Sequence, residues 1–300
     1  EAQGVDQRGE QVWALVEVAP HLADSERSEV CQQIISAGQR IWPTDESTYG
    51  WALASLAPQL SEPLARQALE IAHHIANNYY RAKALAGLLA RLVELGCAEE
   101  ALQVAGAVED GEGRAVVLER LAPYLPESLL LQAVEMAEGV PELDSYSSNS
   151  PQASVLMALI PRLPEPLRAP IQEQALIAAQ NIPDHEGCAQ TLLRLAPQLL
   201  DPLQGTALRL ALLAALRINK DRHRFEREEL LASAAVQLAA LSYERLYPIW
   251  SEVLHDLASH SRQNFLADLR LFVPIIAALG NEMGVIEAMN AIEDVIRWWP

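Results

Sequence analysis

Two short stretches of the sequence carry side chains of the kinds that bind metal ions. Asp184, His185 and Glu186 are consecutive, and His255 is followed five residues later by His260. Metal-binding helices of the H-E-x-x-H type place two histidines four residues apart, so that both lie on one face. Neither stretch has that spacing. We therefore expect both stretches to be structural, and we expect no metal ion and no other cofactor.

Motifs for covalent catalysis and for phosphate binding are missing from the sequence. It contains no G-x-S-x-G turn, which would present a serine nucleophile. It also contains no G-x-x-x-x-G-K-[ST] loop, and Gly111-Glu112-Gly113 lacks the lysine and hydroxyl that hold phosphates. Cys31, Cys97 and Cys188 are far apart and have no C-x-x-C spacing. We therefore expect a chain without catalytic residues.

The densest cluster of polar and aromatic residues falls at an expected turn between helices. Its members are His73, His74, Asn77, Tyr79, Tyr80 and Arg81. The adjacent histidines point about 100° apart on a helix and cannot bind one metal ion by themselves. Exposed tyrosine and arginine are frequent anchors of protein interfaces, so we predict that this cluster binds a partner. The alternative is that the tyrosines pack against the turn and the histidines are hydrated.

One dense basic run stands out in an acidic chain. It consists of Lys220, Arg222, His223, Arg224 and Arg227. Such a run can bind an anionic ligand or an acidic surface, and we predict partner binding by Arg222, His223 and Arg224. Acidic residues are interleaved with it, namely Asp221, Glu226, Glu228 and Glu229. Mixed charge of this kind is also typical of a hydrated loop and helix start, which is the alternative.

A recurring phrase indicates which elements must position these residues. Its form is apolar-small-Pro-x-apolar, as in Leu56-Ala57-Pro58-Gln59-Leu60 and Leu195-Ala196-Pro197-Gln198-Leu199. The proline, or the residue in its place, recurs at positions 20, 58, 90, 123, 161, 197, 240 and 274. A period of roughly 20 to 50 residues is the signature of a solenoid, in which each unit buries its apolar face against its neighbours.

Each repeat is expected to be a pair of helices. Apolar residues three and four apart mark the first helix, as in Leu53, Leu56 and Leu60, and the proline ends it because it lacks an N–H. The second helix opens on an acidic residue and a proline, as at Glu62-Pro63, and carries alanines that allow close packing. This pattern predicts an all-α, α-α solenoid of about eight helical hairpins.

The regularity of the phrase divides the chain. We expect regular hairpins over residues 1–218, followed by divergent repeats and a C-terminal cap over 219–300 that continue the same solenoid. The polar stretch 142–150 is expected to be a long loop between repeats. Trp298 and Trp299 are predicted to cover the apolar face of the last hairpin, the alternative being a contact with another domain or a second copy.

The overall composition excludes several partners. The 300 residues carry a formal net charge of −18, so the surface repels nucleic-acid phosphates. The longest apolar stretch, near 210–216, is too short for a membrane span of about 20 residues. Widely spaced cysteines fit a reducing compartment. We predict a cytoplasmic protein without nucleic-acid or membrane partners, and the start at Glu1 suggests a piece of a longer polypeptide.

The phrase, the alanine-rich second helix, the openings Arg81-Ala82 and Arg114-Ala115, and the ending Val295 to Pro300 carry a family resemblance. In these features the chain resembles the C-terminal helical-repeat regions of bacterial STAND NTPases, the NACHT and NB-ARC-type signalling ATPases. The resemblance implies TPR-like or HEAT-like repeats that sense a ligand and restrain a nucleotide-binding switch. It also implies nucleotide-binding and effector domains of the same polypeptide as partners.

The sequence therefore favours a non-catalytic recognition or sensor module that binds a protein or peptide. We expect the module to belong to a larger signalling ATPase of the STAND type, and defence is one kind of signalling that this covers. An alternative is a structural scaffold that associates with copies of itself through its ends. A third hypothesis is an enzyme with a cleft between repeats, whose activity would depend on residues such as His73 or Asp184.

Overall fold

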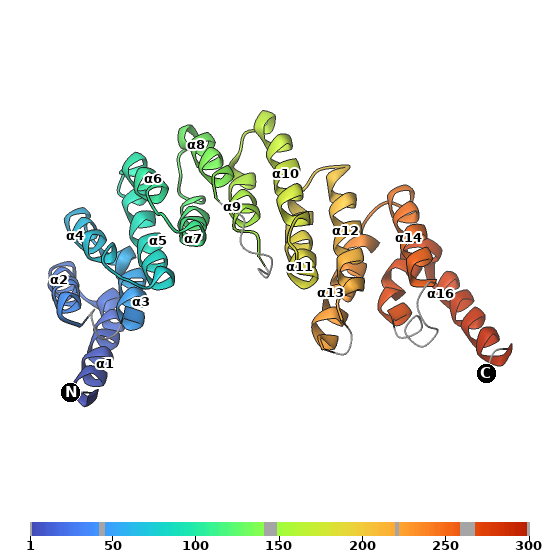
Figure 1. Ribbon diagram of the computed structural model, residues 1–300, viewed down its shortest axis with the longest axis horizontal. Coiled ribbons are helices and arrows are strands. Elements are labelled where there is room, and N and C mark those ends of the chain that lie inside the picture. Colours follow the sequence, from blue (N-terminus) through green and yellow to red (C-terminus); the bar gives the residue numbers. More distant parts are fainter. Residues whose placement is uncertain (1, 42–45, 141–148, 220–221, 259–267, 299–300) are drawn as a thin grey trace. The chain divides into compact units, whose positions relative to one another are not determined.

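The computed structural model describes residues 2–41, 46–140, 149–219, 222–258 and 268–298 (Figure 1). All regular elements within these ranges are α-helices or short 3-10 helices, and none is a β-strand. The predicted all-α class is confirmed. None of the described helices is both long enough and apolar enough to cross a lipid bilayer.

Contacts between residues group the chain into two compact units. The N-terminal unit comprises residues 1–142 and 154–165, and the C-terminal unit comprises 143–153 and 166–300. The predicted division at residue 218 is of another kind, because it rests on the regularity of the repeat and not on contacts. It stays a prediction. The continuous solenoid also stays a prediction, whereas the hairpins inside each unit can be described directly.

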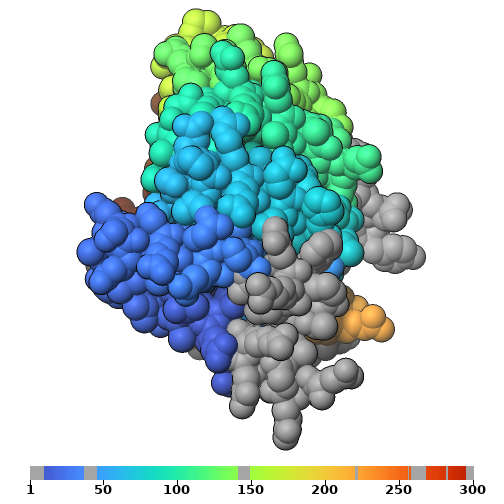
Figure 2. Space-filling model, turned by 90° about the vertical axis from the view of Figure 1, so that its left-hand side faces the viewer, coloured from blue at the N-terminus to red at the C-terminus, as the bar shows by residue number. Residues whose placement is uncertain are grey.

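Hairpins of the N-terminal unit stack in sequence order. Its helices are α1 (Ala2–Val18), α2 (Asp24–Ile41), α3 (Glu46–Leu56), α4 (Glu62–Ala72), α5 (Asn78–Glu94), α6 (Ala98–Gly106), α7 (Gly111–Leu121) and α8 (Glu127–Glu138). First helices α3, α5 and α7 pack on one another, and second helices α4, α6 and α8 lie on the other side (Figure 1). Figure 2 shows the repeats of this unit as successive bands from dark blue through cyan to green.

The C-terminal unit continues the alternation. Its helices are α10 (Glu165–Gln180), α11 (His185–Leu195), α12 (Leu203–Arg217), α13 (Arg224–Ala239), α14 (Tyr243–Ala258) and α16 (Val273–Trp298), and the boundary between the units passes through α9 (Pro151–Leu159). α11 packs on α13, and α12 packs on α14. α16 is interrupted at Asn281, whose φ of 54° is not helical.

The proline phrase ends four first helices as predicted, and the structure shows how. The α-helix stops two residues before the proline, and the residue before the proline, the proline and its successor form a 3-10 turn. These turns are η1 (Ala19–His21), η2 (Ala57–Gln59), η3 (Ile160–Arg162) and η4 (Ala196–Gln198). The last apolar residue of the phrase is extended and donates its N–H back to the turn, as from Leu60 to the Ala57 carbonyl (3.1 Å). A tighter final turn is a common way to satisfy the end of a helix.

Where the phrase lacks its proline or its context, the helix behaves differently. At Ala90 the backbone N–H is retained, and α5 runs on to Glu94. Pro274 was expected near the end of a first helix, and that expectation is wrong. It lies at the second residue of α16, where a proline costs no hydrogen bond. The pair Asp201-Pro202 lies just before a second helix and not in its first turn, because α12 begins at Leu203.

Arginines join successive repeats at equivalent positions. The residue after the anchor position donates to the carbonyl that ends the preceding phrase: Arg91 Nε to the Leu60 oxygen (2.9 Å) and Arg162 Nη2 to the Leu125 oxygen (2.9 Å). On the second helices, Arg66 pairs with Glu62 of its own helix and with Glu100 of α6. The contacts of Arg91 and Arg162 satisfy backbone carbonyls at the ends of the turns, whereas Arg66 pairs with side-chain carboxylates.

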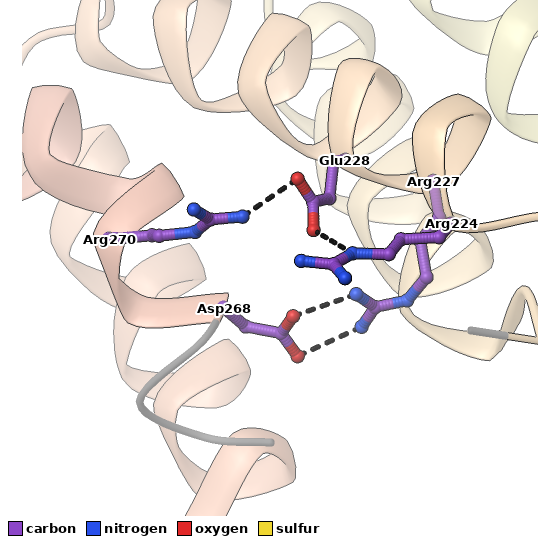
Figure 3. A network of polar contacts seen from close by, with 5 residues as sticks. All are labelled: Arg224, Arg227, Glu228, Asp268 and Arg270. Carbon is purple, nitrogen blue, oxygen red and sulfur yellow. Dashed lines mark hydrogen bonds and ion pairs between the residues drawn. The ribbon is translucent and has the colours of Figure 1, made fainter. Parts of the chain in front are cut away.

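A buried ion pair ties α13 to the start of the last helical segment (Figure 3). Arg227 donates from both terminal nitrogens to the two carboxylate oxygens of Asp268, at 2.7 and 2.9 Å, and both side chains are almost fully buried. Beside this pair, Arg224 and Arg270 each bind a different oxygen of Glu228. The hydrogen bond from Arg224 holds the pKa of Glu228 below its usual value.

Candidate functional site

A groove of about 590 Å³ lies over the first helices of three successive repeats in the N-terminal unit. Trp51 of α3, Lys83 of α5, Glu119 and Arg120 of α7, and Tyr124 supply its large side chains. Between them lie small residues, Ala54, Ser55, Ala86 and Gly87. We call this hollow the first-helix groove.

The groove follows the register of the repeat. Most of its residues lie at three fixed distances before the anchor positions 58, 90 and 123. Seven positions before the anchors are Trp51, Lys83 and Val116. Four positions before them are Ala54, Ala86 and Glu119, and three positions before them are Ser55, Gly87 and Arg120. Residues at these spacings share one face of a helix. Three copies of the same helix face, laid side by side, therefore make the surface.

A cation sits against aromatic rings at one edge of the groove. Lys83 Nζ lies 4.1 Å from the centre of the Trp51 ring and 5.5 Å from that of Tyr79. An ammonium over an aromatic face is attracted by the ring, and the attraction is about 0.5–1 kcal/mol at exposed sites. Trp51 remains 40% exposed, and Tyr79 54% exposed. The contact between Lys83 and Trp51 thus restrains both side chains while the Trp51 ring stays partly open to solvent.

The charged side chains of the groove have no ion-pair partner among the residues that the structure describes. Arg120 and Glu119 are exposed, and neither makes a hydrogen bond or ion pair with a residue that the structure describes. Lys83 lies against the two aromatic rings and makes no hydrogen bond or ion pair with a described residue. The groove therefore presents two cations and one carboxylate on a chain whose net charge is −18.

Two glycines let α3 and α5 approach closely beneath the groove. A Cβ on Gly87 would lie 2.9 Å from the Ala54 backbone, and one on Gly50 would lie 2.9 Å from the Tyr80 carbonyl oxygen. Real Cβ atoms essentially never come so close, so any side chain there would push the helices apart. The glycines thus fix the spacing between Trp51 and Lys83.

Of the predicted 73–81 cluster, much is used to build the turn between α4 and α5. Asn77 caps α5, accepting the N–H groups of Tyr79 (3.0 Å) and Tyr80 (3.2 Å). Arg81 donates to the Ile75 carbonyl at 2.8 Å. His73 and His74 are exposed, and His74 Nδ1 lies 2.7 Å from the Glu70 carbonyl oxygen. Tyr79, which contacts Lys83, brings this cluster to the edge of the groove.

The described residues of the basic run differ in burial and in their ion-pair partners. Arg227, counted in the run from the sequence, is 1% exposed and belongs to the core, because Asp268 compensates its charge. Arg224 pairs with Glu228 at 2.9 Å. Arg222 and His223 are exposed, and His223 Nδ1 lies 3.5 Å from Glu186 Oε2. Lys220 lies outside the described residues. Partner binding by Arg222, His223 and Arg224 stays a prediction.

Residues considered as metal ligands or as catalytic groups are not gathered into one centre. Among the described residues, no three His, Cys, Asp or Glu side chains lie close enough to hold a metal ion. Asp184 accepts the Gly187 N–H at 2.8 Å and caps α11. His255 is exposed, and His260 lies outside the described residues, as do residues 141–148 and the side chains of Trp298 and Trp299. The three cysteines are unpaired thiols.

The groove was not found from the sequence, although a signal for it exists. Trp51 is about 70 residues from Arg120 and Tyr124, and the three residues match no motif. Aligning the repeats on the proline brings Trp51, Lys83 and Val116 to one position, and it brings Trp13 to the same position in the first repeat. The signal that this alignment would have given is a pair of exposed tryptophans, Trp13 and Trp51, at one repeated helix position.

Comparison with known proteins gives no relative. No family model, no curated protein and no solved structure matches the chain.

Proposed function

We propose that this chain is a recognition module, and that the first-helix groove binds a segment of a partner protein. The observation that supports the proposal is the combination of an open hollow of about 590 Å³, exposed Trp51 and Tyr124, and unpaired Arg120. Aromatic residues and arginine are the side chains that most often contribute strongly to binding at protein interfaces. A surface made of several repeats also suits an extended ligand.

The chemistry of the groove favours a segment with an apolar side chain beside a carboxylate. The small residues leave room for the apolar side chain between Trp51 and Tyr124. Arg120 and Lys83 would then face the carboxylate, because a planar guanidinium binds two carboxylate oxygens at once. The net charge of −18 disfavours strongly anionic ligands as a whole, so the preference for a carboxylate depends on the two cations of the groove.

The proposed setting is that of a sensor. By its resemblance to the repeat regions of STAND NTPases, the module would belong to a larger polypeptide whose nucleotide-binding domain responds to the partner. Binding would shift an equilibrium between two states of that polypeptide by the difference in affinity of the ligand for the two states. The attached domains are therefore partners in the proposal, together with the recognised segment.

A library of random peptides displayed on phage tests the proposal with the full 300-residue chain as bait. We expect enriched sequences in which an aromatic or aliphatic residue lies next to Asp or Glu. The enriched phage should lose binding to Trp51→Ala and keep it to Trp13→Ala, since Trp13 holds the same repeat position and is 38% exposed but lies outside the groove. Failure to enrich any sequence, or equal binding to both variants, would refute the groove as a peptide site.

Self-association is a second candidate, favoured by one observation. The segment of α16 after Asn281 exposes three large apolar side chains, Met283 (60%), Ile286 (48%) and Met289 (58%). Light scattering over a hundredfold range of protein concentration measures the molar mass and so tests for self-association. A mass that rises with concentration, and that Met289→Glu returns to the monomer value, supports self-association. A constant monomer mass rules it out.

A further inference from the structure

The C-terminal unit contains a second cavity, formed by two turns that are distant in sequence. It measures about 330 Å³. One side is the turn between α10 and α11, residues 183–186, and the other is the end of α12 with the following turn, where Arg217, Arg222 and His223 lie. Two motifs that stood apart in the sequence, Asp184-His185-Glu186 and the basic run, thus face one space. We call it the turn cavity.

The acidic groups of the turn cavity are engaged within the chain. Asp184 accepts the Gly187 N–H and so caps α11. Glu186 accepts Gln190 Nε2 at 3.5 Å through one oxygen, and its other oxygen lies 3.5 Å from His223 Nδ1. Asp184 already accepts a backbone N–H at the N-terminus of α11. We therefore do not expect the backbone N–H groups of this helix end to bind a ligand.

The cationic groups, in contrast, are left without a partner among the described residues. Arg217 and Arg222 are exposed, and neither makes a hydrogen bond or an ion pair with a residue that the structure describes. Two guanidinium groups that line one cavity offer up to ten N–H donors. The imidazoles of His185 and His223 line the same space and add donors when protonated.

We propose that the turn cavity binds a phosphate group through Arg217 and Arg222. A tetrahedral phosphate has enough oxygens for bidentate bonds to both guanidiniums, and arginine matches this geometry better than lysine does. The volume falls at the small end of the range for ligand pockets, so a single phosphate or a phosphorylated side chain fits, rather than a polymer. The site is separate from the first-helix groove and does not depend on it.

Two-dimensional NMR of the full chain tests the site at constant pH and ionic strength. Inorganic phosphate and O-phosphoserine are titrated separately, with sodium chloride as the reference. We expect saturable shifts of the backbone amides of His185, Arg222 and His223. The double variant Arg217→Gln, Arg222→Gln should weaken binding at least about tenfold, because it removes the charge-assisted hydrogen bonds. Tighter binding of phosphoserine would indicate a phosphorylated side chain, and equal or weaker binding would indicate free phosphate.

Arg194→Gln is the matched control. Arg194 is exposed on α11 and lies outside the turn cavity, so the affinity should not change. Circular dichroism of each variant checks that the helices are retained. Shifts that grow linearly without saturation, an unchanged affinity in the double variant, or an equal loss in Arg194→Gln would overturn the proposal.

Discussion

At the scale of single residues, the buried ion pair between Arg227 and Asp268 is structural rather than functional. Arg227 and Asp268 are 1% and 2% exposed, and each compensates the other's charge. Basic residues near helix starts are usually hydrated, so the sequence offered no reason to separate Arg227 from its neighbours. Its partner lies 41 residues away. Such a pairing depends on tertiary structure and could not be read from local pattern.

Breaking this pair from one side should be costly. Arg227→Met leaves a buried, unpaired carboxylate, so we expect the free energy of unfolding to fall by about 3–5 kcal/mol. The double variant Arg227→Met, Asp268→Leu buries no charge and should lose far less. Urea denaturation followed by circular dichroism measures both. Equal losses in the single and double variants would show that the pair is not compensated as described.

Thiol reactivity should follow burial. Burial raises the pKa of Cys188 to about 11 and also raises that of Cys31, so the reactive thiolate form of both is scarce at neutral pH. Cys97 is partly exposed. Brief treatment with iodoacetamide at pH 7.5, followed by peptide mass spectrometry, should label Cys97 first and the other two only after unfolding. Early labelling of Cys188 would contradict the packing of α11.

At the scale of elements, the hairpins could be predicted and their close contacts could not. The spacing of Leu53, Leu56 and Leu60 and the phrase at Pro58 were sufficient to place α3 and its end. The role of Gly87 was not predictable, because a glycine within a helix gives no sign of which backbone it approaches. Likewise, Asn77 and Asp184 looked like candidate functional residues, and the structure uses both as helix caps.

Two glycine substitutions with opposite expected signs test the helix spacing. Gly87→Ala places a Cβ 2.9 Å from the Ala54 backbone, so we expect a loss of about 1–3 kcal/mol in the free energy of unfolding. Gly205→Ala, also within a helix, would meet only the end of Ile249 at 3.6 Å and should gain up to about 1 kcal/mol. Thermal unfolding compares them. A stabilised Gly87→Ala would mean that α3 and α5 are not in such close contact.

At the scale of the whole molecule, the fold class followed from the period, while the binding surface did not. Each repeat carries the same apolar face inward, so the phrase alone predicts stacked hairpins. The exposed face differs between repeats: tryptophan, lysine and valine hold one position in three successive first helices. Aligning the repeats shows which residues share this position, but it does not show how their side chains combine into a surface. The groove became visible only when the helices lay side by side.

In the proposed peptide site, Arg120 is the residue that binds the carboxylate of the ligand, and a charge exchange at Arg120 tests this role directly. A peptide enriched by phage display is titrated by calorimetry against the chain and against Arg120→Glu and Arg194→Glu, which hold the same repeat position in different units. We predict a loss of at least about tenfold for Arg120→Glu, no change for Arg194→Glu, and partial recovery when the acidic residue of the peptide becomes lysine. Equal affinity of the peptide for all three proteins would contradict the proposed site.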